Sequence, residues 1–266
     1  GSMDSTVKSI INNNSTFSPG DLFAINAPYN GGTHLPDITI VNPIWNSDKS
    51  EIIFYTAARG HHTDIGGLTP GSMPCNSKDI HEEGIYIDNW KIVDNGIFRE
   101  EDFKNKILSG PYPARSPLTN IADLKAQIAA CKKGEAELLK IVNKYGLETV
   151  FRFQELVCQN AENAVRESIK TIKGTEVTYY MDNDLLGGSR KINIRLTPNI
   201  EDSSIEVDFN GTTMQLESNY NAPLPVTRAA VLYAFRILTG GNIPMNSGIM
   251  KPIKIKIPRG SMLSPE

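Results

Sequence analysis

Histidine and aspartate lie together at two places in the first third of the chain, and both places could bind a metal ion. The segment GGTHLPD contains His34 and Asp37, and ARGHHTD contains His61, His62 and Asp64. The apolar run DITIVNPI begins at the first segment and EIIFYTAA precedes the second, and both are typical of strands. Strand ends that open into glycine-rich loops can bring imidazole and carboxylate groups together. Nitrogen and oxygen ligands without thiolate suit Zn²⁺, Mn²⁺ or Fe²⁺.

Local backbone geometry limits how each segment can bind. Pro36 biases the preceding residue toward an extended conformation, so His34 and Asp37 would chelate from a loop and not from one helical face. The adjacent His61 and His62 point in opposite directions if the backbone there is extended, so we expect one ligand and one residue that orients a ligand or contacts substrate. Spacing alone leaves a second interpretation open, in which these side chains lie in solvated loops.

The other candidates for chemistry have less support in the sequence. His81 fits a surface position on a helix or loop, and Glu82 and Glu83 are either a solvated acidic pair or the source of a general base or further ligand. Cys75 has no histidine at a spacing that supports a thiol nucleophile. Neither GxxxxGK[ST] nor GxGxxG occurs, so this sequence predicts no phosphate loop of those types.

Composition narrows the class of protein. The 266 residues allow one large domain or two ordinary ones, and a net charge of -3 argues against a nucleic-acid partner. No apolar run reaches the roughly 18 residues of a membrane span, and the start lacks a signal-peptide pattern. Cys75, Cys131 and Cys158 are an odd number without a CxxC pair, which argues against a disulfide framework. We therefore expect a cytoplasmic chain.

Residue periodicity predicts an α+β fold with mixed β-sheet layers, a long antiparallel helical hairpin and a further C-terminal helix. A β-rich region at 20–115 carries both His/Asp loops. Helical patterns at about 118–145 and 147–172, separated by Gly146, form the hairpin in a region at 116–173. A third, α+β region at 174–266 contains alternating strands, a helix from PVTRAAVLYAFRILTG and a last strand at PIKIKIP.

The chain resembles the hydantoinase B/5-oxoprolinase family over nearly its whole length. Matching runs, in order, include GDLFAINAPYNGGTHLPDITIVNPI, ARGHHTDIGGLTPGSMP, VDFNGT, NAPLPVTRAAVLYAFRIL and IPRGSMLSP. The second and last of these are most similar to the 5-oxoprolinase branch. Two positions differ from the common pattern, with Ala27 where many members have Asp and Cys75 where Pro is usual.

This resemblance implies the B-type part of an ATP-dependent amidohydrolase that opens a cyclic amide such as 5-oxoproline or a hydantoin. An A-type partner subunit or domain would bind ATP and Mg²⁺ and phosphorylate the ring amide, and the B part would complete ring opening within an oligomeric complex. Related acetone and acetophenone carboxylases bind a divalent metal through homologous loops. By this resemblance His34, Asp37 and His61 are ligands of Mn²⁺ or Zn²⁺, with His62 and Asp64 nearby as catalytic residues beside Glu83.

Two alternatives stay open. The chain could be a subunit of an acetone- or acetophenone-type carboxylase, or a non-catalytic assembly module whose loops bind a partner chain. B-type parts of the family are roughly twice as long as this chain, which would make it a fragment of a larger hydantoinase B domain. Such a fragment could keep the metal site and lack turnover.

Overall fold

The computed structural model describes residues 2–182, 190–241 and 243–266, and the chain divides into two compact units. An N-terminal unit covers Ser2–Lys140, and a C-terminal unit covers Ile141–Glu266. Their boundary falls inside one long helix, α3 (Pro117–Tyr145), whereas the sequence predicts three regions with boundaries in loops. Both His/Asp loops belong to the N-terminal unit.

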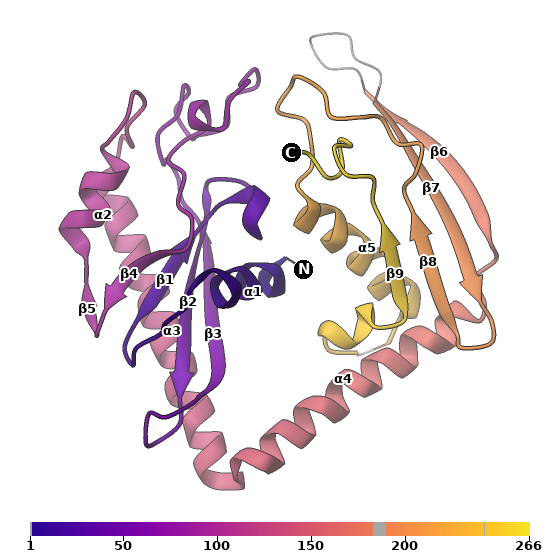
Figure 1. The fold of residues 1–266 in the computed structure, drawn as a ribbon, viewed down its shortest axis with the longest axis horizontal. Helices are drawn as coiled ribbons and strands as arrows, with labels where there is room; N and C mark the ends of the chain where they lie inside the picture. The colour runs from indigo at the N-terminus through magenta and orange to yellow at the C-terminus, as the bar shows by residue number, and fades with distance from the viewer. Residues whose placement is uncertain (1, 183–189, 242) are drawn as a thin grey trace. The chain divides into compact units, whose positions relative to one another are not determined.

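The N-terminal unit is built on a five-stranded antiparallel sheet in the order β3-β2-β1-β4-β5 (Figure 1). Isoleucine, valine and aromatic residues dominate the central strands and favour extended backbone. The strands are β1 (Leu22–Ile25), β2 (Asp37–Trp45), β3 (Ile52–His61), β4 (Trp90–Asp94) and β5 (Ile97–Phe98). Strands β2 and β3 lie at the two apolar runs that predict strands, and β5 is a two-residue strand that the residue pattern does not indicate.

Successive residues of each strand point to opposite sides of the sheet, and apolar residues are buried on both sides. Helices cover both faces. On one face α1 (Met3–Asn13) buries Ile10 in a cluster that includes Val41. On the other face α2 (Glu100–Ile107) and α3 bury Phe103 and Leu124 with Ile40. The 3-10 helices η1 (Pro28–Asn30) and η2 (Ile80–Glu82) lie in the connecting loops.

The C-terminal unit contains a four-stranded sheet in the order β6-β7-β8-β9, whose last pair is parallel. Its strands are β6 (Thr175–Met181), β7 (Arg190–Asn199), β8 (Ser204–Asp208) and β9 (Ile253–Lys256). The helices are α4 (Leu147–Ile169), α5 (Leu224–Thr239) and the 3-10 helix η3 (Ser247–Met250). A single core joins Val165, Val207, Phe235 and Ile249 from these elements.

The predicted α+β fold class is confirmed, and both long helices follow their predicted ranges. Gly146 separates α3 from α4 with a φ of 83°, in the left-handed region that glycine adopts at low cost. The buried residues of α3 belong to the core of the N-terminal unit, and those of α4 belong to the core of the C-terminal unit.

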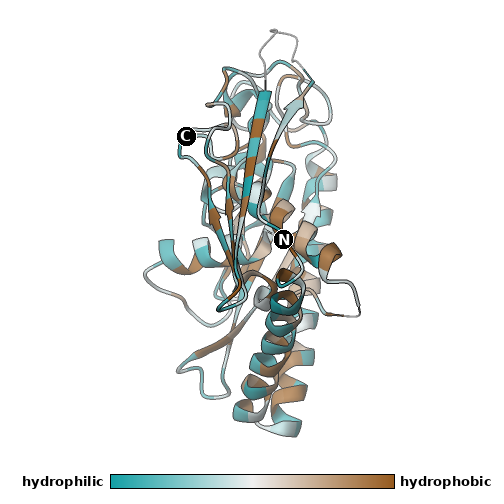
Figure 2. Cartoon of the chain, turned by 90° about the vertical axis from the view of Figure 1, so that its right-hand side faces the viewer, coloured by the Kyte–Doolittle hydropathy of each residue, from teal (hydrophilic) through white to brown (hydrophobic). Residues whose placement is uncertain are grey.

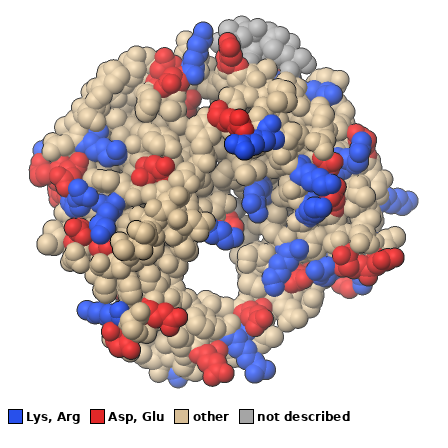
Figure 3. Space-filling model, viewed as in Figure 1, with Lys and Arg blue, Asp and Glu red and all other residues tan. Residues whose placement is uncertain are grey.

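Polar and apolar residues alternate closely along the helices and strands (Figure 2). Within the described part of the chain, no helix is both long and apolar enough to cross a membrane. Figure 3 shows acidic and basic side chains interspersed on the face in view, in keeping with the small net charge.

Candidate metal centre

The ends of β2 and β3 bring the two His/Asp loops together. Asp37, the first residue of β2, is the cross-strand partner of His61, the last residue of β3. Partners across an antiparallel pair point to the same face, so these side chains share one edge of the sheet. His34, in the loop before β2, places its ring centroid 5.0 Å from that of His61 and its Nδ1 3.3 Å from Asp37 Oδ2.

Asp37 is held as a carboxylate beside the two imidazoles. Burial by itself would raise its pKa, but hydrogen bonds from His34 and from Thr33 Oγ1, the latter 2.8 Å long, outweigh burial and lower the pKa. The side chains of His34 and Asp37 are 33% and 21% exposed, and His61 is exposed, so a solute can reach all three.

These three residues offer the donor chemistry of a divalent-metal site, two imidazole nitrogens and one carboxylate. In the described ranges, no group of three or more His, Cys, Asp or Glu side chains is already arranged as a metal cage. The fit of these three residues to a metal ion therefore rests on their donor atoms and on their position at one end of β2 and β3. Their side chains would have to rotate to bind the same ion. The metal centre remains a prediction.

His62 points away from this edge and is completely buried. Its ring lies between two polar residues of α3, with Nε2 3.1 Å from Gln127 Oε1 and Nδ1 3.1 Å from Asn120 Nδ2. The backbone N–H of His62 donates to the carbonyl of Pro36 at 2.8 Å, between His34 and Asp37. His62 thus ties the end of β3 to both α3 and the neighbouring loop.

The hydrogen bonds of Gln127 determine which nitrogen of His62 carries the proton. Gln127 Nε2 donates to the carbonyls of Ile38 and Ala58 at 2.8 and 3.1 Å, so its Oε1 must accept from His62 Nε2–H. Nδ1 is then the acceptor for Asn120. Burial lowers the pKa of His62, with the Gln127 bond opposing, so the ring is neutral at pH 7.

We expect Gln127→Leu to lower the free energy of unfolding of the N-terminal unit by about 1 to 3 kcal/mol, because buried partners lose their hydrogen bonds. Urea unfolding followed by circular dichroism measures this loss. Long-range ¹H–¹⁵N spectra should show only the Nε2–H tautomer of His62 in the unmodified chain. A doubly protonated ring at pH 7 would contradict the assignment, and Gln154→Leu on the exposed part of α4 is a control for substitution alone.

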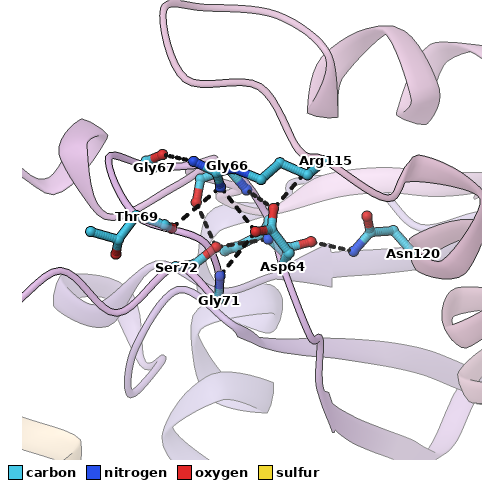
Figure 4. A network of polar contacts seen from close by, with 9 residues as sticks. Asp64, Gly66, Gly67, Thr69, Gly71, Ser72, Arg115 and Asn120 are labelled. Atoms are coloured by element: carbon cyan, nitrogen blue, oxygen red, sulfur yellow. Dashed lines mark hydrogen bonds and ion pairs between the residues drawn. The ribbon is translucent and has the colours of Figure 1, made fainter.

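Asp64 organises the glycine-rich loop that follows β3 (Figure 4). Its Oδ1 accepts from the backbone N–H groups of Gly66 and Arg115 at 3.0 and 3.1 Å. Its Oδ2 accepts from Gly71 N–H at 3.0 Å and from Arg115 Nη1 at 2.9 Å. The Asn120 amide also donates to the Asp64 carbonyl at 2.9 Å, so α3 contacts this loop as well as His62.

This network commits both carboxylate oxygens of Asp64 to the loop. Burial alone would raise the pKa of Asp64, but the hydrogen bonds from Gly66, Gly71 and Arg115 lower it. The loop also needs glycine at Gly66, where φ is 91° and a Cβ would lie 2.1 Å from the carbonyl oxygen of Tyr112. Asp64 therefore shapes the loop behind the candidate metal centre.

Glu83 is an acidic side chain whose charge interacts with that of His34. Burial raises its pKa, while a hydrogen bond from Ser77 Oγ at 2.8 Å and the charge interaction with His34 oppose that rise. The same carboxylate contributes to a raised pKa of Tyr29, after burial. A raised pKa favours the protonated form of the carboxyl group, which is the form that a general acid needs.

The remaining candidates lie elsewhere in the same unit. His81 and Glu82 lie in η2, where the Glu82 carboxylate takes part in a capping box with Asp79. Cys75 is exposed, and Ala27, at the position where the family often has Asp, is completely buried.

Three further residues, in α3 and the loop before it, support the site although the sequence does not single them out: Arg115, Asn120 and Gln127. Asn120 and Gln127 are polar residues seven positions apart on the apolar face of α3, with Leu124 between them. A polar pair on a buried helical face indicates buried hydrogen bonds, and that signal was available. Arg115 lies in an irregular loop and carried no comparable signal.

Comparisons with known proteins show the family to which the chain belongs. The family described as Hydantoinase B/oxoprolinase matches residues 1–266. The chain is 38% identical over 287 residues to 5-oxoprolinase 1 of Arabidopsis thaliana. The aligned region covers 100% of this chain and 22% of that protein. This chain thus spans less than a quarter of that relative's length.

Two solved structures share the fold. The ATP-dependent caprolactamase from Pseudomonas jessenii matches with a TM-score of 0.88 and 21% identity, over 100% of this chain and 45% of that one. An acetone carboxylase matches with a TM-score of 0.83 and 20% identity, over 99% of this chain and 36% of that one. The match of the family model along residues 1–266 shows that the chain belongs to the hydantoinase B/oxoprolinase family.

Proposed function

We propose that this chain is the B-type part of an ATP-dependent cyclic-amide hydrolase and completes the ring opening of 5-oxoproline or a hydantoin. Family membership and the relative named 5-oxoprolinase 1 support this proposal. The observation that carries it is the pairing of Asp37 with His61 at a shared strand end, with His34 beside both. An A-type partner would bind ATP and Mg²⁺, as the family resemblance implies, and neither phosphate-loop motif occurs in this chain.

In this proposal His34, Asp37 and His61 hold a divalent cation, Mn²⁺ or Zn²⁺. Such a cation polarises a carbonyl oxygen and lowers the pKa of a bound water. Asp37 is suited to this role because its pKa is lowered and it stays ionised at neutral pH. His34 and His61 present imidazole rings at an edge that solvent reaches.

Glu83 is the proposed proton acceptor and donor. Its raised pKa and its charge interaction with His34 support this role. It would take a proton from the water that attacks the phosphorylated amide and return one to the ring nitrogen as the C–N bond breaks. The acyl phosphate that results would be hydrolysed by a second water, which releases inorganic phosphate and leaves the carboxylate. His62 and Asp64 would act indirectly, since both side chains are buried in hydrogen bonds that fix the backbone around His61.

Metal analysis of the purified chain tests the proposed site. We expect about one equivalent of Mn²⁺ or Zn²⁺ in the unmodified chain and at least a tenfold weaker affinity in His34→Ala and in His61→Ala, since each loses a donor. His81→Ala is the matched control, because this exposed histidine lies in η2 and should leave metal content unchanged. Full metal content in both ligand variants would overturn the assignment.

Turnover requires the longer protein or complex that contains this region. With an ATP-binding A-type part present, we expect phosphate release that depends on 5-oxoproline and is lost with His61→Ala. Bicarbonate-dependent ATP turnover with a ketone, and none with 5-oxoproline, would instead indicate a carboxylase subunit. A metal-free chain that still binds the A-type part tightly would indicate an assembly module.

A further inference from the structure

Arg59 lies on the same face of the sheet as the candidate metal centre. It precedes His61 by two residues on β3, so the two side chains point to the same side. Its cross-strand partner is Thr39, two residues after Asp37 on β2. Arg59 and Thr39 thus form the cross-strand pair next but one to the pair of candidate ligands, His61 and Asp37.

Three hydroxyl groups hold the guanidinium of Arg59. Nε donates to Thr39 Oγ1 at 2.8 Å, Nη1 to Ser2 Oγ at 2.5 Å, and Nη2 to Thr6 Oγ1 at 2.7 Å. Thr6 Oγ1 in turn donates to the carbonyl of Gly31, in the loop that carries His34. Arginine has five N–H donors, so two remain after these three bonds.

In the described ranges, the hydrogen-bond partners of the Arg59 side chain are these three hydroxyl groups. No carboxylate there lies within hydrogen-bond distance of it. The side chain is partly buried, and burial lowers the pKa of Arg59 while the charge of Asp37 opposes this effect. Guanidinium nevertheless stays protonated in proteins. In the proposed site the charge of Asp37 would be shared with the metal, which would leave Arg59, two residues before His61 on β3, as a positively charged group with two uncommitted N–H donors.

We propose that Arg59 binds a carboxylate of the substrate and thereby selects lactams that carry a carboxylate over neutral cyclic amides. This inference rests on the proposed function and deepens it. Residues two apart on a strand are separated by about 6 to 7 Å. A five-membered lactam with its carboxylate next to the ring nitrogen can reach from Arg59 to the neighbourhood of His61, which favours 5-oxoproline over a hydantoin.

A pair of ring compounds isolates the carboxylate. 5-Oxoproline and 2-pyrrolidinone share the lactam ring, and only the first carries a carboxylate. Each is titrated into the Mn²⁺-loaded chain, and binding is followed by calorimetry and by the relaxation of ligand protons near the ion. The variants are Arg59→Gln, which removes the charge, and Arg59→Lys, which keeps charge but loses the planar fork. Arg195→Gln on β7 is the matched control in the other unit.

We expect the unmodified chain to prefer 5-oxoproline, and Arg59→Gln to weaken its binding about 10- to 100-fold, as for loss of a charged hydrogen bond. Binding of 2-pyrrolidinone should not change, and Arg59→Lys should retain part of the preference. Equal weakening of both rings would show a merely structural role and overturn the proposal, as would an unmodified chain that binds both equally or neither.

Metal content separates this inference from the proposed function. If Arg59→Gln keeps its metal but the carboxylate preference was never present, the Arg59 inference fails alone. If the chain binds no metal yet prefers 5-oxoproline through Arg59, the metal-dependent function fails and the carboxylate site stands. Thermal unfolding of each variant verifies that the fold is intact in these measurements.

Discussion

Replacing Asp64 by alanine is expected to destabilise the N-terminal unit by about 3 kcal/mol or more, because a buried carboxylate with four hydrogen-bond donors is removed. The N–H groups of Gly66 and Gly71 would lose their acceptor, and Arg115 would lose its ion-pair partner. Urea unfolding of the variant measures the change. Asp48→Ala is a matched control, because this aspartate also accepts from nearby donors but lies in an exposed turn.

The same group predicts a pH dependence. The pKa of folded Asp64 lies below its ordinary value near 3.8, so the folded state favours the ionised form. Its stabilising effect is complete above the unfolded pKa and is lost as pH falls through the lower, folded pKa. Asp64→Asn should therefore show a smaller fall in stability below about pH 4 than the unmodified chain. Identical acid profiles would contradict this assignment.

Gly248→Ala is expected to destabilise the C-terminal unit by about 3 kcal/mol or more, through overpacking. A Cβ at this position would lie 1.9 Å from the carbonyl oxygen of Cys158, so η3 and α4 would have to separate. The cost comes from sterics and not from the φ angle, which any residue could adopt here. Thermal unfolding and limited proteolysis of the C-terminal unit report the loss.

Gly174→Ala is the matched control for this substitution. Its added Cβ would lie 3.5 Å from the nearest heavy atom, the carbonyl oxygen of Leu196, which is ordinary van der Waals contact. We expect a change within about 0.5 kcal/mol in either direction. A well-folded Gly248→Ala variant with unchanged stability would show that η3 does not pack on α4 as described.

The sequence predicted the elements more completely than their contacts. Long helices such as α3 and α4 carry many turns of a 3.6-residue pattern, so their bounds were predicted closely. The strand ends near Asp37 and His61 were also indicated, because one apolar run begins at Asp37 and the other ends shortly before His61. Short elements such as β5 have too few residues to show a pattern.

The roles of His62 and Asp64 could not be predicted because their partners are distant in sequence. Gln127 lies 65 residues after His62, and Arg115 lies 51 residues after Asp64. Type and spacing within one segment cannot show whether a polar side chain faces solvent or a buried helix. The metal assignment of His34, Asp37 and His61 remains a prediction for the experiment described above.

The contacts between α3 and β2 follow a common spacing. Gln127 donates to the carbonyl of Ile38, Cys131 Sγ to that of Ile40, and Asn42 donates to Glu135, so each step of four residues in the helix matches two in the strand. Four helical residues advance about 6.0 Å and two strand residues about 6.8 Å, so the two repeats nearly coincide over this length.

This near-match keeps three polar contacts of α3 aligned with alternate residues of β2. Adding one residue to α3 before Gln127 would turn the following side chains by about 100° about the helix axis. All three contacts with β2 would then be lost together. The candidate ligand Asp37 is adjacent to Ile38, whose carbonyl accepts the first of these hydrogen bonds. Length changes in this helix would therefore reach the metal edge of the sheet, although no residue of α3 is a candidate ligand.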